Sequence, residues 1–84
     1  MHTPTTAELL NAIEVLKKLG QRINEHAAHS VSQLPDTQLG DNYAAHIEAR
    51  TIEQTGHIET VVMQLQNWRE ELIQQRRQNV SLSV

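Results

Sequence analysis

Apolar residues recur at helical spacing along two long stretches of the chain. The first stretch runs from Leu9 to Leu34 and the second from Ala44 to Ile73, in steps of three and four. Such steps place the apolar side chains on one face of an α-helix and the charged side chains on the other. The pattern predicts an all-α fold with two amphipathic helices, over about residues 6–33 and 41–78.

Both predicted helices have recognisable ends. Thr5 and Glu8 have the spacing of a capping box, in which each side chain bonds the backbone amide of the other residue. Asp41 or Asn42 can cap the second helix, and the arginines at 76 and 77 suit its carbonyl end. Residues 1–4 and 79–84 continue neither stripe, so we expect them to be disordered.

Gly20 leaves two interpretations of the first helix. Basic residues followed by glycine are typical of a helix end, and a break here would give a globule of three or four helices. Leu16, Gly20, Ile23 and Ala27 nevertheless stay in phase across the glycine. We therefore expect one continuous helix, which an interior glycine destabilises by about 1 kcal/mol.

The segment from Leu34 to Gly40 is the predicted turn. Pro35 cannot continue a helix, and Gly40 permits backbone angles that other residues resist. A short turn between two long helices gives an antiparallel hairpin. Folding near residue 39 sets Leu9 against Trp68, Ile13 against Leu65, Leu16 against Val61 and Val62, Gly20 against Ile58, and Ala27 against Thr51.

The expected core and interface residues follow from this pairing. They are Leu9, Ile13, Leu16, Gly20, Ile23, Ile58, Val62, Leu65, Trp68 and Leu72. A small Gly20 opposite a large Ile58 gives the glycine a packing role. The stripe is weaker around Thr51, Gln54 and Thr55, where the contact is either looser or sets the register through buried polar groups.

Length and composition indicate that one chain buries little. The 84 residues form one domain, and they are 38% hydrophobic with one Trp, one Tyr and no Phe. A chain of this size buries about 60–65% of its unfolded surface, which makes a lone hairpin marginal. We therefore expect two hairpins to dimerise into a four-helix bundle.

The charge and the residue types narrow the function class. A formal net charge of −3 argues against nonspecific nucleic-acid binding. The absence of cysteine excludes disulfides and thiolate metal sites. No apolar run has the length of a signal peptide or membrane span, so the expected location is cytoplasmic.

Histidines are the only candidates for chemistry. His26 and His29 lie three apart, and Glu53 and His57 lie four apart. Di-metal bundles use Glu-x-x-His, whereas the spacing here is Glu-x-x-x-His. We expect no metal and no cofactor. The preferred interpretation is solvated side-chain pairs on the long helix, with imidazoles near the end of the first helix.

No enzyme motif is present: no nucleophile stands beside a base, and there is no glycine-rich phosphate loop. Trp68 is either a core residue at the open end of the hairpin or an interface anchor. Ile52 and Val15 lie off the main stripe and are candidate partner contacts.

The expected function is therefore that of a small, non-enzymatic interaction or assembly protein. It would act as a homodimer and bind a protein partner through exposed helix faces. One alternative is an accessory nucleic-acid-binding regulator that uses Lys17, Lys18, Arg22 and the C-terminal arginines. A second alternative is a metal-binding helical bundle.

Overall fold

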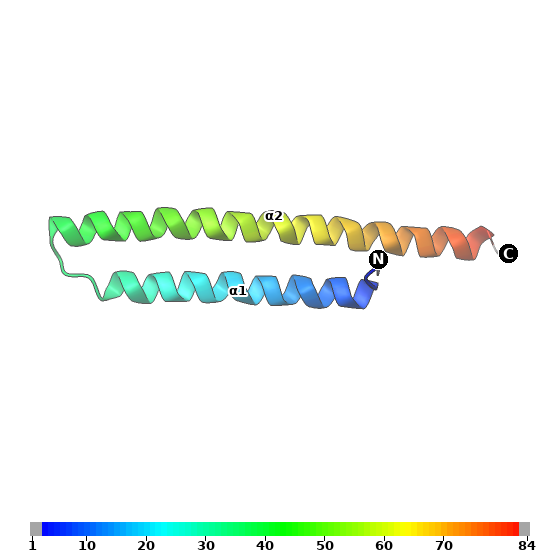
Figure 1. Ribbon diagram of the computed structural model, residues 1–84, viewed down its shortest axis with the longest axis horizontal. Coiled ribbons are helices and arrows are strands. Elements are labelled where there is room, and N and C mark those ends of the chain that lie inside the picture. The colour runs from blue at the N-terminus through cyan, green and yellow to red at the C-terminus, as the bar shows by residue number, and fades with distance from the viewer. Residues whose placement is uncertain (1–2, 83–84) are drawn as a thin grey trace.

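The chain folds into an antiparallel hairpin of two long helices (Figure 1). The computed structural model describes residues 3–82, and the side chains of residues 3–78. Helix α1 spans Thr6–Ser32 and helix α2 spans Gln38–Leu82. The predicted all-α hairpin is confirmed. Neither helix, over the part described, is long and apolar enough to cross a membrane.

Helix α1 begins at the predicted capping box. The Glu8 amide donates to Thr5 Oγ1 at 3.1 Å, and the Thr5 amide donates to Glu8 Oε1 at 3.2 Å. The helix then runs without interruption through Gly20. The continuous helix is confirmed, because the apolar stripe on both sides of the glycine packs against the same partner helix.

Helix α2 begins three residues earlier than expected. The Gly40 amide donates to Thr37 Oγ1 at 3.1 Å, and the Asp41 amide donates to the Thr37 carbonyl at 2.9 Å. Thr37 is thus the residue that caps α2, and the prediction of Asp41 or Asn42 as the cap is wrong. Asp41 lies in the first turn instead, where a carboxylate suits the amino end of a helix.

Gly40 is required for a steric reason and not for an unusual backbone angle. No described glycine has a positive φ. A Cβ at Gly40 would lie 2.0 Å from the Pro35 carbonyl oxygen. The first turn of α2 therefore passes so close to the loop that only glycine fits there.

The far end of α2 also differs from the prediction. The helix continues to Leu82, whereas the expected end was about residue 78. Residues 3–5 have no regular structure, and residues 1–2 and 83–84 lie outside the described part of the chain. The boundary was missed because residues 79–82 remain helical without an apolar stripe.

Helix α2 extends past both ends of α1 (Figure 1). It has 45 residues against 27 in α1. The hairpin is 70 Å long and has a radius of gyration of 19.6 Å, whereas a compact domain of this length has about 12 Å. Much of the chain therefore lies far from any shared core.

The core between the helices is a single narrow row. Among the described apolar side chains, only Leu9, Ile13 and Val62 are buried. The expected core residues Leu16, Gly20, Ile23, Ile58, Leu65 and Leu72 are half-buried. Trp68 remains 42% exposed. Two helices cover only one stripe of each other, and this leaves the flanks of both stripes open.

The register between α1 and α2 can be checked at Gly20. A Cβ built there would lie 3.9 Å from Ile58 Cγ2, which is an ordinary van der Waals contact. The helices therefore meet in the predicted register at this layer. The proposed packing reason for the glycine is wrong, however, because the site has room for alanine.

Polar groups in the weaker half of α2 bond to their own helix. Thr51 Oγ1 donates to the Ile47 carbonyl at 2.7 Å, and Thr55 Oγ1 donates to the Thr51 carbonyl at 2.9 Å. Serine and threonine commonly satisfy their hydroxyls in this way inside helices. These bonds do not set the register between α1 and α2, so the looser of the two sequence interpretations applies.

Gly40→Ala and Gly56→Ala are predicted to have opposite effects. The first places a methyl group against the Pro35 carbonyl and should lower the free energy of unfolding by on the order of 1–3 kcal/mol. Nothing lies within 4 Å of a Cβ at Gly56, so the second should raise it by about 1 kcal/mol through helix propensity. Urea unfolding at one protein concentration measures both. Equal effects would contradict the close approach at the turn.

Gly20→Ala should also stabilise the hairpin, by about 1 kcal/mol. The added methyl group meets Ile58 at ordinary contact distance and removes backbone freedom from the unfolded chain. The same urea titration applies. A loss of stability would show that the helices approach each other more closely at this layer than described.

Candidate functional site

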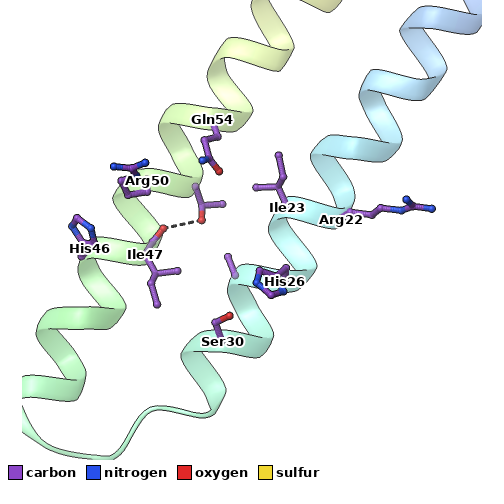
Figure 2. Close-up of a pocket in the computed structure, with 10 residues that line it drawn as sticks. Arg22, Ile23, His26, Ser30, His46, Ile47, Arg50 and Gln54 are labelled. Atoms are coloured by element: carbon purple, nitrogen blue, oxygen red, sulfur yellow. Dashed lines mark hydrogen bonds between the residues drawn. The ribbon is translucent and has the colours of Figure 1, made fainter.

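A groove near the turn end is lined by both helices (Figure 2). We call it the histidine groove. It is lined by Arg22, Ile23, His26, Ala27 and Ser30 of α1 and by His46, Ile47, Arg50, Thr51 and Gln54 of α2. It lies where the small Ala27 and Thr51 leave the helices thinly filled. Its volume is about 440 Å³.

The groove has an apolar floor and a basic rim. Ile23 and Ile47 project into the space between the helices, whereas Arg50 and His46 project from the far side of α2 (Figure 2). Arg22 points away from α2 on the other side. Because the cationic groups do not converge on one point, the arrangement suits an apolar or aromatic group better than a small anion.

The same side of the hairpin stays apolar beyond the groove. Steps of three and four lead along α1 from Ile23 to Leu19 and Leu16, and steps of seven lead along α2 from Gln54 to Val61 and Trp68. Residues at these spacings share one side of a helix. We define the apolar face as Leu16, Leu19, Ile23, Val61, Leu65 and Trp68.

The apolar face is substantially open to solvent. Leu19 is 46% exposed, Val61 is 41% exposed and Trp68 is 42% exposed. Leu16, Ile23 and Leu65, which complete the face, are half-buried. Large apolar side chains are often exposed singly, but a continuous row on one side usually marks an interaction site.

The opposite side of the hairpin is mixed, with charged and amide groups beside the exposed apolar side chains of Ile52 and Met63. A second groove there is lined by Lys17, Gly20, Gln21 and Asn24 of α1 and by Thr55, Ile58, Glu59, Val62, Met63 and Gln66 of α2. Charged and amide groups dominate its rim. The two sides of one hairpin thus differ in degree: the apolar face has the longer row of large apolar side chains, and the opposite side interrupts its apolar groups with charged and amide groups.

The metal candidates do not form a cluster. His26 lies in the histidine groove and His29 in the last turn of α1, while Glu53 and His57 are exposed on α2. Over the part of the chain that the structure describes, no three histidine, aspartate or glutamate side chains gather as metal ligands. Within one chain, the described residues therefore offer pairs of possible ligands but no set of three.

The basic residues of the nucleic-acid alternative are divided between two sides. Lys17 lines the second groove, whereas Arg22 lines the histidine groove. Arg69 is engaged within the hairpin, where its Nε donates to the Thr6 carbonyl at 3.3 Å and joins the open ends of the helices. These cations make no single basic face.

Sequence reasoning set both Val61 and Val62 against Leu16, and it missed the exposure of Val61. A signal was available in the pair Val61–Val62. Adjacent residues in a helix point about 100° apart, so both valines cannot face α1. Val62 is 8% exposed and faces α1, whereas Val61 points to the flank. A stripe that is too wide for one partner helix indicates a second contact.

Comparisons with family models, curated proteins and solved structures gave no significant match to the chain.

Zinc at about 1 mM should leave the thermal stability of the protein unchanged. A site with a dissociation constant of about 10 µM would be at a hundredfold excess of ligand and would add about 2.7 kcal/mol to the free energy of unfolding. His26→Gln combined with His29→Gln is the matched control. Zinc-dependent stabilisation that this pair abolishes would establish the metal-binding alternative.

Proposed function

We propose that the chain is a small, non-enzymatic interaction and assembly protein that acts as a homodimer. The apolar face of one hairpin packs on the same face of a second copy and gives a four-helix bundle. The outward surfaces, including the side of α2 that carries Ile52, are then free for a protein partner. The exposed apolar face is the observation that carries this proposal.

The energetics of the hairpin support a second copy. Only three described apolar side chains are buried in one chain, so little hydrophobic free energy opposes the entropy of ordering two long helices. Covering a half-exposed leucine or valine contributes on the order of 1 kcal/mol. In a symmetric dimer both copies of each residue of the face are covered. The hydrophobic free energy summed over both copies is then comparable to the free energy of unfolding of a small domain.

The shape of the hairpin supports the same arrangement. The molecule is 70 Å long and only 15 Å in its thinnest direction, so one broad side can meet another over several turns. A twofold dimer requires a face that is complementary to itself. A row of aliphatic side chains meets this condition, because leucine and valine pack against their own kind.

The dimer should be visible in the absolute mass. Light scattering or sedimentation equilibrium over a range of concentrations is expected to give twice the chain mass of 9.6 kDa. A mass that stays at one chain at every accessible concentration would refute the proposal.

Leu19→Glu and Val61→Glu should each raise the dissociation constant of the dimer more than tenfold. The measured mass should then shift towards that of the monomer. Both side chains are over 40% exposed in the single hairpin, so a glutamate there should leave the hairpin itself stable. It should destabilise the dimer, because two charges would be buried near each other at the interface. Ile52→Glu is the matched control, because Ile52 is 72% exposed and lies away from the apolar face. Circular dichroism reports whether each variant stays helical. An equal effect of Ile52→Glu would place the interface elsewhere.

A further inference from the structure

We infer that the histidine groove is the receptor for Trp68 of a second copy, and that the two turns of the dimer lie at opposite ends. This inference rests on the proposed homodimer and specifies its geometry. It identifies the occupant of the groove as an indole side chain. It also gives Trp68, which is 42% exposed in one chain, the role of an interface anchor.

The position of Val61 within α2 is the first argument. Helix α2 spans Gln38–Leu82, so Val61 lies next to its midpoint and belongs to the apolar face. Two α2 helices that cross antiparallel at Val61 overlap along almost their whole length. This overlap covers the segments of α2 that extend past α1 at both ends (Figure 1).

The register about Val61 brings Trp68 to the groove. Gln54 precedes Val61 by seven residues and Trp68 follows it by seven. Seven residues are almost two turns, about 10 Å, so all three side chains lie on the same side of α2. In an antiparallel pair centred on Val61, the partner's Trp68 is level with Gln54. Gln54 lines the histidine groove.

The same twofold axis also pairs α1 with the partner's α1. The contact of Gly20 with Ile58 places Lys17 level with Val61. About Lys17, Leu19 is level with the partner's Val15, and both are exposed apolar side chains in one chain. His26 is level with the partner's Glu8, which is a complementary pair, whereas His46 on the α2 rim is level with the partner's Arg76.

The groove also has the chemistry that an indole requires. Ile23 and Ile47 offer an apolar floor, and small Ala27 and Thr51 leave room above it. Arg50 lies one turn from Gln54 on the rim. Its guanidinium, which projects from the far side of α2 in the single chain, would turn towards the groove to meet the indole face, an attraction of the cation–π type. Arginine beside tryptophan is a common combination at binding hot spots. The charged and titratable groups that line the groove are Arg22, His26, His46 and Arg50, and the partner's Glu8 and the partner's Arg76 are level with His26 and His46.

The alternative dimer has both turns at the same end. Each α2 would then lie over the partner's α1, and Trp68 would meet the partner's open end. Trp68 is eighteen residues from Arg50 along α2, which corresponds to about 27 Å. The two arrangements therefore place the indole either within the groove or far from it.

Tryptophan fluorescence distinguishes the two dimer arrangements, because Trp68 is the only tryptophan in the sequence. A protonated imidazole in contact with indole quenches its emission. We expect the emission of the wild-type dimer to be lower at about pH 5.5 than at about pH 8. His26→Gln should lose much of this quenching. His29→Gln is the matched control, since His29 lies in the last turn of α1 and outside the groove.

The outcomes separate the two proposals. The mass is measured at both pH values for every variant. A dimer whose quenching is absent, or is unchanged in His26→Gln, overturns the groove assignment and leaves the dimer intact. A monomer at both pH values overturns both.

A cysteine at position 61 gives a second, independent measurement. The chain has no cysteine, so Val61→Cys carries a single thiol. With the turns at opposite ends, residue 61 of each copy lies beside its counterpart at the twofold axis, within the short reach of a disulfide. We expect mild oxidation to link nearly all of the Val61→Cys dimer and little of the Ile52→Cys control. A dimer of Val61→Cys that does not link would overturn the antiparallel arrangement.

Discussion

The structure depends on one narrow contact, the row of apolar side chains where two long helices meet. Leu9, Ile13 and Val62 are the described apolar residues that this row buries. A hairpin has no third layer, so every apolar side chain that turns away from the row meets solvent. Both the weakness of the single chain and the apolar face beside the row follow from this geometry.

The composition of the two ends fits this arrangement. Close to the open end, Leu9 and Ile13 fill the row and Arg69 bonds across it to Thr6. Close to the turn, Ala27 and Thr51 fill it only in part, and the histidine groove results. One end of each hairpin thus has a projecting aromatic residue, and the other end has space. Under twofold symmetry with opposed turns, these two features compensate each other.

The sequence predicted the elements of the fold better than their ends. The continuity of α1 could be predicted, because Leu16, Gly20 and Ile23 keep one helical phase. The start of α2 could not, because Gly40 has the appearance of a turn residue. It is glycine because the helix approaches the Pro35 carbonyl, and that contact exists only after folding. The position of the apolar face depends on whether Val61 or Val62 faces α1, and this is decided only when the two helices pair.

The unequal lengths of the helices have a consequence for how the chain opens. The last turns of α2 have no α1 beside them (Figure 1), and an isolated helix shorter than about 12–15 residues is marginal in water. In a single chain these turns unwind independently of the rest, at low free energy. Arg76 and Arg77 lie there, exposed, where a trypsin-like protease can cut an unwound backbone. Lifetime in a proteolytic environment would then depend on how much of the protein is paired, so that unassembled copies are degraded first.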